Sequence, residues 1–435
     1  MFEKLTAVLV VGGKGARLGL TKIPKALVPI AGVPLLERSI RQLADQGVRR
    51  IALLAGHLGE QIEQRFGDGS TFGLTIDVIR EAAPLGPAGC FHAVRDRLNE
   101  PFIVIYGDVL WDVDLARFVA FARDRGGLGT LYAHPNDHPF DSDLIEADAK
   151  GKILAFHPKP HAGGLERRNL VNAAFYVLSP AILDHVPAAP TASDWGADVF
   201  PAVVRNGGAL HAYRGAEYIH DIGTPARLAR SEAALLGGAV AARSYRHPQT
   251  AVFLDRDGVL NREIDGVRSP DQLELLPGVA EAVRRINRSG ALAICVTNQP
   301  GRAKGWLDEA QLEAIHARLD AELARDGAYL DDLLVCPHHP ETGWPGEDPS
   351  LKIACECRKP EPGLLTAAMA RHNIDPARSV IVGDHWRDIE AGRRAGVKGI
   401  LVGSDAPPVG AQKAGDLAAA VELFFSKRAV AKALA

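Results

Sequence analysis

Short apolar runs recur along the chain, and each of them ends at a loop of glycine or polar residues. The first spans residues 7–11 and leads into a glycine-rich loop, and residues 102–106 repeat the pattern before Gly107 and Asp108. In the second half the pattern recurs at residues 251–254, 292–296 and 380–382. Apolar runs of this length, separated by helical segments, are typical of strands in a parallel sheet. The pattern therefore predicts an α/β protein whose polar loops gather at the carboxyl ends of its strands.

The length of the chain and a break near its middle predict two domains. A chain of 435 residues is too long for one ordinary core. Residues 226–236 have helical spacing, and this helix ends at Gly237 and Gly238. We expect a first domain over residues 1–238, a short linker over residues 239–250 and a second domain over residues 251–435.

Composition and charge exclude several classes of protein. The hydrophobic content of 47% and the charged content of 24% are those of a globular protein. The net charge of -3 predicts no bulk attraction to nucleic acid or to an anionic membrane. The apolar run at residues 5–11 is shorter than a membrane span and leads straight into glycines, so we expect a cytoplasmic protein without a signal peptide. The sequence leaves open whether the chain forms a homo-oligomer.

The loop after the first strand has the chemistry of a phosphate site. It reads Gly12-Gly13-Lys14-Gly15-Ala16-Arg17-Leu18. Its glycines let backbone N–H groups approach phosphate oxygens closely. It is neither a P-loop, because no Gly-Lys-Ser/Thr closes it, nor a dinucleotide fingerprint, because Leu18 replaces the third glycine. Arg17 and Lys25 would bring two cations to this loop, which suits a triphosphate.

GGKGARL at residues 12–18, followed by PKALVPIAGVPLL at residues 24–36, resembles the signature of the sugar-1-phosphate nucleotidylyltransferases. The resemblance covers the first domain. It implies a Rossmann-like fold and a reaction in which a sugar 1-phosphate attacks a nucleoside triphosphate and expels pyrophosphate. Catalysis of that kind depends mainly on positioning and charge neutralisation.

Later positions of the first domain match the same family in order. LGPAG at residues 85–89 resembles the base-contacting loop, so Gly86 and Gly89 are implied substrate contacts together with Gly12, Gly13 and Gly15. The resemblance further implies magnesium ligands at Asp108 and Asp221, a lysine for the sugar phosphate at Lys159 and a sugar contact at Asn172. Three positions differ from the usual residues of the family. Ala16 and Pro87 stand where threonine is usual, and Pro158 stands where glutamate is usual. These departures keep open a domain that only binds a nucleotide sugar and regulates.

Two carboxylates, Asp255 and Asp257, follow the apolar run at residues 251–254. At the end of a strand this spacing lets one side chain attack while the other handles protons. For this motif alone, a solvated turn is the alternative. Other polar groups follow in comparable settings, namely Thr297 and Asn298, Lys359, Asp384 and Asp388. They favour a site at one edge of a parallel sheet.

The order DxDG, TN, K and GDxxxD resembles the haloacid dehalogenase-like phosphatases. The resemblance implies that Asp255 is the nucleophile that forms an aspartyl phosphate and that Asp257 is the acid and base. Magnesium would be held by Asp255, the backbone carbonyl of Asp257, and Asp384. Thr297, with Asn298 beside it, and Lys359 would hold the phosphate. Asp388 either orients its neighbours or is an ordinary acid at a helix N-terminus.

Three of the 5 cysteines share one stretch with a histidine, as Cys336-Pro337-His338 and Cys355-Glu356-Cys357. Two tight pairs that offer three thiolates and an imidazole suit a closed tetrahedral zinc site. Buried free thiols are the alternative, and His339 is a substitute for His338. Because Lys359 closely follows Cys357, we expect a structural zinc ion that fixes the loop of this lysine.

No cap domain fits between Asp255 and Thr297. The capless, zinc-clipped form resembles the D-glycero-D-manno-heptose 1,7-bisphosphate phosphatases and the histidinol phosphatases. Arg358 and the loop NQPGRAKG favour the heptose group, and Arg302, Lys304 and Arg358 are candidates to contact a second phosphate. His385 stands where the heptose group usually has lysine.

Together the two resemblances imply a bifunctional enzyme of nucleotide-activated heptose biosynthesis, with magnesium at both sites. One domain would remove the 7-phosphate of heptose 1,7-bisphosphate, and the other would transfer a nucleotidyl group to heptose 1-phosphate for a lipopolysaccharide or S-layer glycan. The resemblance of the first domain to heptose-1-phosphate guanylyltransferases implies GTP. The alternatives are a mannose-type guanylyltransferase joined to a phosphatase for another sugar phosphate or histidinol phosphate, and a phosphatase with a non-catalytic first domain.

Overall fold

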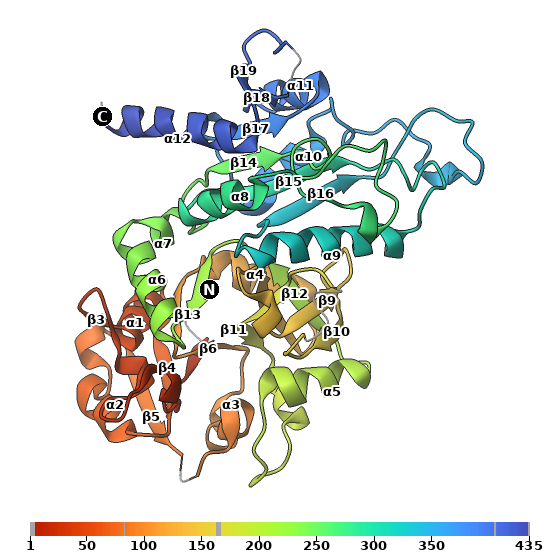
Figure 1. Ribbon diagram of the computed structural model, residues 1–435. Coiled ribbons are helices and arrows are strands. Elements are labelled where there is room, and N and C mark those ends of the chain that lie inside the picture. Colours follow the sequence, from red (N-terminus) through yellow and green to blue (C-terminus); the bar gives the residue numbers. More distant parts are fainter. Residues whose placement is uncertain (1–4, 82, 162–166, 404–405, 434–435) are drawn as a thin grey trace. The chain divides into compact units, whose positions relative to one another are not determined.

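The computed structural model describes residues 5–81, 83–161, 167–403 and 406–433 (Figure 1). The chain folds into two compact units. The first unit contains residues 1–134, 142–159 and 170–246, and the second contains residues 135–141, 160–169 and 247–435. Among the described residues, no helix has both the length and the apolar character needed to span a membrane. The boundaries proposed above from sequence remain a prediction.

A nine-stranded mixed sheet organises the first unit, with the strand order β10-β9-β11-β6-β1-β4-β5 and with β8 and β12 attached beside β11. The strands are β1 Thr6–Val10, β4 Arg50–Ala55, β5 Thr75–Arg80, β6 Phe102–Tyr106, β8 Gly129–His134, β9 Leu144–Ala147, β10 Ile153–His157, β11 Val171–Leu178 and β12 Leu210–Arg214. The helices are α1 Leu35–Asp45, α2 Gly59–Phe66, α3 Gly86–Gly89, α4 Leu115–Arg125, α5 Phe200–Arg205, α6 Pro225–Leu236 and α7 Ala239–Ala242.

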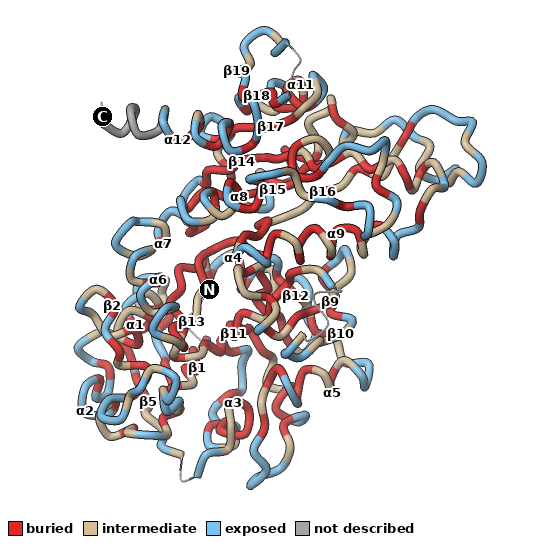
Figure 2. Tube along the Cα trace, viewed as in Figure 1, coloured by how far each residue is buried: buried red, intermediate tan, exposed pale blue. Residues whose placement is uncertain are grey.

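Both faces of strand β1 are buried, which explains why the first apolar run has no polar positions. Ala7 and Leu9 belong to one core cluster, whereas Val8 belongs to another on the opposite face of the sheet. Figure 2 shows the central strands as buried segments between exposed loops. Because β1 and β6 are parallel and in register from Thr6 with Phe102, the glycine loop and the Gly107-Asp108 turn emerge at the same edge.

Two small antiparallel sheets complete the first unit. They consist of β2 Pro29–Ile30 with β3 Val33–Pro34, and of β7 Val109–Asp112 with β13 Tyr218–Asp221. In the second pair Asp221 lies opposite Val109, and the N–H of Ile222 donates to the carbonyl oxygen of Asp108 at 2.9 Å. This pairing brings two aspartates that are far apart in sequence to neighbouring backbone positions.

A six-stranded parallel sheet organises the second unit, with the order β16-β15-β14-β17-β18-β19 (Figure 1). The strands are β14 Ala251–Leu254, β15 Leu292–Asn298, β16 Asp332–Cys336, β17 Val380–Gly383, β18 Lys398–Val402 and β19 Gln412–Ala414. The helices are α8 Val279–Arg288, α9 Glu309–Arg325, α10 Gly363–His372, α11 Trp386–Arg394 and α12 Leu417–Ala433. The predicted parallel sheet is confirmed.

The strand order fixes where the second unit can hold a ligand. β14 lies between β15 and β17, and the connection after β14 runs to β15 on one side whereas the connection after β17 runs to β18 on the other side. Open α/β sheets bind ligands at such a switch point, outside the carboxyl ends of the strands. Asp255, Thr297 and Asp384 stand at or just after these three ends.

Candidate active sites and a candidate metal centre

A pocket of about 480 Å³ opens in the first unit beside the glycine loop. Its lining contains most of the predicted nucleotide contacts, namely Gly12, Gly13, Gly15, Arg17, Lys25, Gly86 and Asp108. Gly15 has a φ of 66°, and a Cβ atom there would lie 2.8 Å from Leu20 Cδ1, so a side chain at this position would strain the turn. The structure thus brings the predicted phosphate loop and its cations to one concave surface.

The cations of this pocket lie beside the two aspartates. Lys25 is only 9% exposed, and its ammonium group contacts the Asp108 carboxylate directly. Arg17 lies close to Gly223, which follows Asp221 by two residues. A Cβ atom built on Gly223 would be 3.1 Å from Arg17 Nη2. Asp221 itself accepts from Arg227 Nη1 at 3.0 Å. Carboxylate oxygens are the donors that Mg²⁺ prefers, and in this structure those of Asp108 and Asp221 are paired with Lys25 and Arg227.

Glu81 is a pocket residue that the sequence reasoning missed. It follows β5 directly and lines the pocket. Its Oε1 is buried and makes no hydrogen bond to the described part of the chain. Burial raises the pKa of the Glu81 carboxyl above its ordinary value, although the N–H of Leu85 opposes this shift. The available signal was a carboxylate at a strand end just before the LGPAG loop.

The predicted sugar contacts Lys159 and Asn172 both bond to Asp143. The backbone N–H of Lys159 donates to Asp143 Oδ1 at 3.2 Å, and the N–H of Asn172 donates to the carbonyl oxygen of Asp143 at 3.0 Å. Lys159 is exposed and Asn172 is half-buried. Lys159, Asn172 and the buried Gly89 are not among the residues described as lining the pocket.

The second unit concentrates carboxylates around one buried lysine. The Lys359 Nζ atom lies 2.8 Å from Asp255 Oδ1 and 2.7 Å from Asp388 Oδ1, and it donates to the carbonyl oxygen of Val296 at 2.8 Å. Burial disfavours its charge, but the carboxylates outweigh burial and raise the pKa of Lys359 above its ordinary value. Lys359 therefore holds the two aspartates as a fixed cation.

One ammonium group does not balance the negative charge at this edge. Donor atoms of Asp255, Asp384 and Asp388 all lie within 4.8 Å of one another. Burial and the Asp388 charge raise the pKa of Asp255 to about 7, and burial and the Asp255 charge raise the pKa of Asp384 to about 6. A crowded, partly desolvated set of carboxylate oxygens fits Mg²⁺.

Asp388 also has a structural task within this set. It is fully buried, and its Oδ2 accepts from the backbone N–H of His385 at 3.1 Å in a capping box at the start of α11. With Lys359 on its other oxygen, Asp388 is both an acid at a helix N-terminus and a partner of the buried lysine, so the structure does not separate the two roles considered from sequence.

Asp257 is surrounded by three hydrogen-bond donors that the sequence did not reveal. Arg256 Nη2 donates to Asp257 Oδ2 at 2.9 Å, Gln299 Nε2 donates to the same oxygen at 2.6 Å, and Asn261 Nδ2 donates to Oδ1 at 2.9 Å. Burial would raise the pKa of Asp257, but Arg256 and the amide donors lower it below its ordinary value. The arrangement fixes the carboxylate beside Asp255.

Thr297 and Asn298 lie at the end of β15. Thr297 is 1% exposed, and its Oγ1 accepts from Gln299 Nε2 at 2.9 Å. Asn298 Nδ2 donates to the carbonyl oxygen of Lys359, and the N–H of Lys359 donates back to Asn298 Oδ1, each at 3.0 Å. Asn298 thus positions the backbone of the buried lysine.

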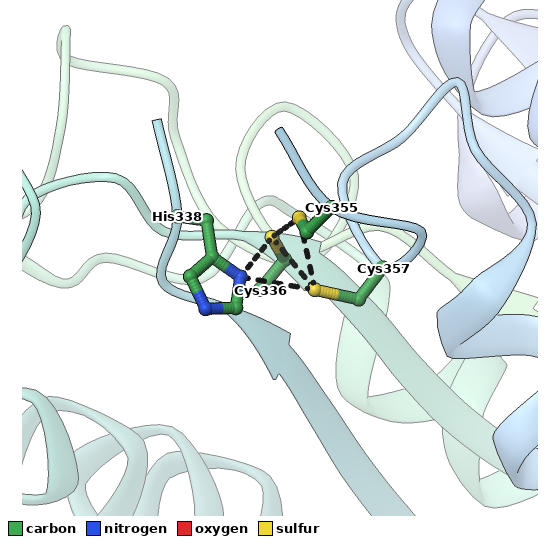
Figure 3. Close-up of side chains that lie close together, drawn as sticks. All are labelled: Cys336, His338, Cys355 and Cys357. Atoms are coloured by element: carbon green, nitrogen blue, oxygen red, sulfur yellow. Dashed lines mark hydrogen bonds between the residues drawn. The ribbon is translucent and has the colours of Figure 1, made fainter. Parts of the chain in front are cut away.

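Cys336, His338, Cys355 and Cys357 converge in the second unit, as Figure 3 shows. The Sγ–Sγ separations are 3.1, 3.3 and 3.6 Å, and His338 Nδ1 lies 3.2 Å from Cys357 Sγ and 3.7 Å from Cys336 Sγ. Tetrahedral zinc with Zn–S bonds of about 2.3 Å requires edges of about 3.7 Å. The four residues therefore fit a zinc ion after small adjustments.

His338 rather than His339 faces the thiols. The His339 ring instead meets the Trp344 ring edge-on at a centroid distance of 4.9 Å. Close by, Arg358 Nη1 donates to the carbonyl oxygen of His338 at 3.1 Å, whereas Arg302 forms an ion pair with Glu309.

Two family models match the chain. Residues 6–237 match the nucleotidyl transferase model, and residues 356–422 match the HAD-hydrolase-like model. The D-glycero-beta-D-manno-heptose-1,7-bisphosphate 7-phosphatase of Rhodopseudomonas palustris is 39% identical over 149 residues, which are 34% of this chain and 81% of that protein. The D-glycero-D-manno-heptose-1,7-bisphosphate 7-phosphatase of Thermosynechococcus vestitus is 43% identical over 158 residues, which are 36% of this chain and 79% of that protein.

Two solved structures are similar to different parts of the chain. A D,D-heptose 1.7-bisphosphate phosphatase from B. bronchiseptica has 34% sequence identity and a TM-score of 0.37, covering 41% of this chain and 99% of that one. HddC from Yersinia pseudotuberculosis has 26% identity and a TM-score of 0.46, covering 53% of this chain and 99% of that one.

Proposed function

Because the chain belongs to the nucleotidyl transferase family through residues 6–237 and also to the D-glycero-D-manno-heptose-1,7-bisphosphate 7-phosphatase family, we propose that it performs two consecutive steps on one heptose. The second unit removes the 7-phosphate of D-glycero-D-manno-heptose 1,7-bisphosphate. The first unit transfers GMP from GTP to the resulting heptose 1-phosphate. The observation that carries this proposal is the presence of both sites on one chain, since the anomeric phosphate that one site spares is the nucleophile that the other needs.

In the phosphatase site Asp255 attacks the 7-phosphorus, and the bond to the sugar oxygen breaks. Asp257, once protonated in the substrate complex, gives this proton to the departing oxygen, and it later takes one from the water that hydrolyses the aspartyl phosphate. Lys359 holds Asp255 in place and neutralises phosphate oxygens, and the Thr297 hydroxyl donates a hydrogen bond to them. A magnesium ion held by Asp255, the carbonyl oxygen of Asp257, and Asp384 would supply further charge neutralisation.

In the transferase site the protein positions reactants rather than reacting with them. The backbone N–H groups of the glycine loop, with Arg17 and Lys25, hold the triphosphate. Lys159 binds the sugar phosphate and Asn172 the sugar, so that a phosphate oxygen of heptose 1-phosphate attacks the α-phosphorus in line. Asp108 and Asp221 would hold a magnesium ion that neutralises the phosphates.

Glu81 supports guanine as the base. The Watson–Crick edge of guanine offers two adjacent donors, N1–H and the N2 amino group, which one carboxylate can accept together. The other common bases present an acceptor beside or around their donor on this edge. A carboxylate with a buried oxygen that has no hydrogen bond to the described residues would therefore favour GTP.

The Cys₃His cluster is proposed to hold a structural zinc ion. Cys357 and Lys359 are separated by one residue, so a metal at this cluster would fix the chain that carries the catalytic lysine.

The proposed transfer uses nucleotides of the cytoplasm, so the proposal places the protein there. Its product would supply a lipopolysaccharide or S-layer glycan.

A one-pot assay tests the proposal. Purified protein is given heptose 1,7-bisphosphate, Mg²⁺ and each nucleoside triphosphate in turn, and phosphate, pyrophosphate and sugar nucleotide are measured separately. GDP-heptose with equal amounts of phosphate and pyrophosphate is expected, and Glu81→Gln should lose most of the preference for GTP. Phosphate without pyrophosphate for every nucleotide would leave a phosphatase with a non-catalytic first domain, and the transferase would then be screened with mannose 1-phosphate. Turnover of histidinol phosphate in preference to the heptose would contradict the assigned substrate.

A further inference from the structure

Two tryptophans in the second unit hold a lysine between their rings. Lys304 Nζ lies 4.4 Å from the centre of the Trp306 ring and 4.8 Å from the centre of the Trp344 ring. Each ring is also contacted by a second cation, because the Arg268 guanidinium lies 4.1 Å from the centre of the Trp306 ring and Lys352 Nζ lies 4.1 Å from the centre of the Trp344 ring. A lysine side chain ordinarily moves among many rotamers, so these contacts fix its ammonium group in one place.

We call Trp306 and Trp344, with Lys304 between them in the cluster, the clamp. The two tryptophans are its arms, and each is fixed in its own loop. Trp306 lies on the segment after β15, and Trp344 lies between Cys336 and Cys355. Glu347 Oε2 accepts from the N–H of Trp344 at 3.1 Å, which orients the second arm. A Cβ atom on Gly305, whose φ is 70°, would lie 2.0 Å from the carbonyl oxygen of Gly346, so only glycine allows the two segments to approach.

Among the described residues, Lys304 forms no ion pair with a carboxylate. Lys352 pairs with Glu347 at 3.2 Å and Arg302 pairs with Glu309. Within the described residues, neither Lys304 nor Arg358 has a comparable ion pair. Burial lowers the pKa of Lys304, the charges of Arg358 and Lys352 add to this shift, and the carboxylates of Asp265 and Glu341 oppose it. Half-buried like charges held together in this way favour the binding of an anion.

The clamp is attached to the catalytic edge through both of its loops. Lys304 follows the segment in which Gln299 donates to Asp257 at 2.6 Å. Arg358 immediately precedes Lys359, which lies 2.8 Å from Asp255. The fixed cations are therefore carried by the same loops that hold the nucleophile and the acid.

We propose that Trp306 and Trp344 are positioning residues that fix Lys304 as the anchor for the anionic group that the phosphatase does not cleave. In the proposed function, on which this inference rests, that group is the anomeric phosphate of the bisphosphate. The clamp makes the site selective for a substrate with two phosphates, because the second phosphate meets an ammonium group whose side-chain entropy has already been lost.

The test compares heptose 1,7-bisphosphate with heptose 7-phosphate, which lacks only the anomeric phosphate. Trp344→Leu and Trp306→Leu should each raise KM for the bisphosphate about tenfold, the effect expected from losing a partly desolvated cation–π contact. KM for the monophosphate and kcat for both substrates should change less than about twofold. Lys304→Gln should give the same selective loss, and adding Trp344→Leu to it should have little further effect, since both changes remove one interaction. Lys398→Gln, at an exposed lysine of β18, is the matched control.

Zinc content and melting temperature are measured for every variant to exclude a collapsed loop. Equal losses on both substrates, or additive losses in the double variant, would show that the tryptophans only support the fold and would overturn the inference. If the unmodified protein hydrolyses the bisphosphate but binds the monophosphate equally well, the inference fails while the proposed function stands. If it hydrolyses neither heptose phosphate, both fail.

Discussion

The two active sites handle phosphates with opposite distributions of charge. In the first unit, glycine backbone and cations surround the pocket, and its two aspartates already contact Lys25 and Arg227. In the second unit, three clustered aspartates share one lysine. A site that positions two anionic reactants needs cations, whereas a site that attacks phosphorus with its own side chain needs a carboxylate. The charge pattern therefore distinguishes the two chemistries more clearly than the shared substrate class does.

The two sites also differ in how deeply their charged side chains are buried. The side chains of Lys25 and Asp108 are 11% and 30% exposed, whereas those of Lys359 and Asp388 are 1% and 0% exposed. Removing one charge from the buried set leaves an uncompensated partner, so the second site should be the more sensitive to substitution.

The largest effect is expected for Asp255→Asn. The variant lacks the nucleophile, so phosphate release from heptose 1,7-bisphosphate should fall at least about 10⁴-fold. Nucleotide transfer to added heptose 1-phosphate should stay within about twofold, because the site of transfer lies in the other unit. Parallel assays of phosphate and pyrophosphate provide the measurement, and loss of both activities would contradict two separate sites.

Asp108→Asn is the reciprocal change in the first unit. It removes one proposed magnesium ligand and the contact with Lys25, so transfer should fall about 10²–10³-fold. Phosphate release should be unaffected, and heptose 1-phosphate should accumulate. Unchanged pyrophosphate production would show that Asp108 is only a turn residue.

Removal of zinc should also lower the phosphatase activity more than the transferase activity, but by a smaller factor than these substitutions. Protein stripped with a chelator and returned to Mg²⁺ should lose about tenfold or more of its phosphatase activity, because the loop of Lys359 is released. Transfer should be retained, and added zinc should restore phosphate release. The metal is quantified alongside activity, and full phosphatase activity without zinc would refute this role for the Cys336 cluster.

The smallest effect concerns an acid that is buried for packing rather than chemistry. Burial raises the pKa of Glu217 from its ordinary value of 4.5 to about 8, and Oε1 accepts from the N–H groups of Asp114 and Tyr245 at 2.8 and 2.9 Å. Between these pH values the folded protein holds one more proton than the unfolded chain. The contribution to stability is therefore complete below about pH 4.5 and is lost as the pH rises towards 8.

Glu217→Gln removes this titration while keeping the acceptor oxygen. Calorimetry at several values between pH 5 and pH 8.5 should show the first unit of the original protein losing about 2–4 kcal/mol of stability, and the variant losing less. Equal slopes for the two proteins would contradict a titrating Glu217.

The sequence predicted the features that depend on local pattern. The buried runs at β1, β14, β15 and β17 predicted an α/β fold, and the family matches confirm a nucleotidyl transferase combined with a phosphatase. The tight spacing of Cys336 with His338 and of Cys355 with Cys357 was enough to predict a metal-binding group, because each pair is short and rigid.

Features that depend on long-range packing could not be predicted. Gln299 reaches Asp257 across 42 residues, and no local pattern indicates which way either side chain turns. Trp306 and Trp344 meet Lys304 only after two loops fold together. The inclusion of residues 135–141 and 160–169 in the second unit likewise depends on long-range packing that the order of the motifs does not contain.

A ³¹P NMR time course of the unmodified protein with heptose 1,7-bisphosphate, GTP and Mg²⁺ tests the central claim most directly. The account predicts that the C7 phosphate signal disappears first with release of inorganic phosphate. The anomeric phosphate signal should then move to that of a sugar diphosphate while pyrophosphate appears. Loss of the anomeric phosphate as inorganic phosphate, or a sugar nucleotide that still carries the C7 phosphate, would contradict two ordered steps on one chain.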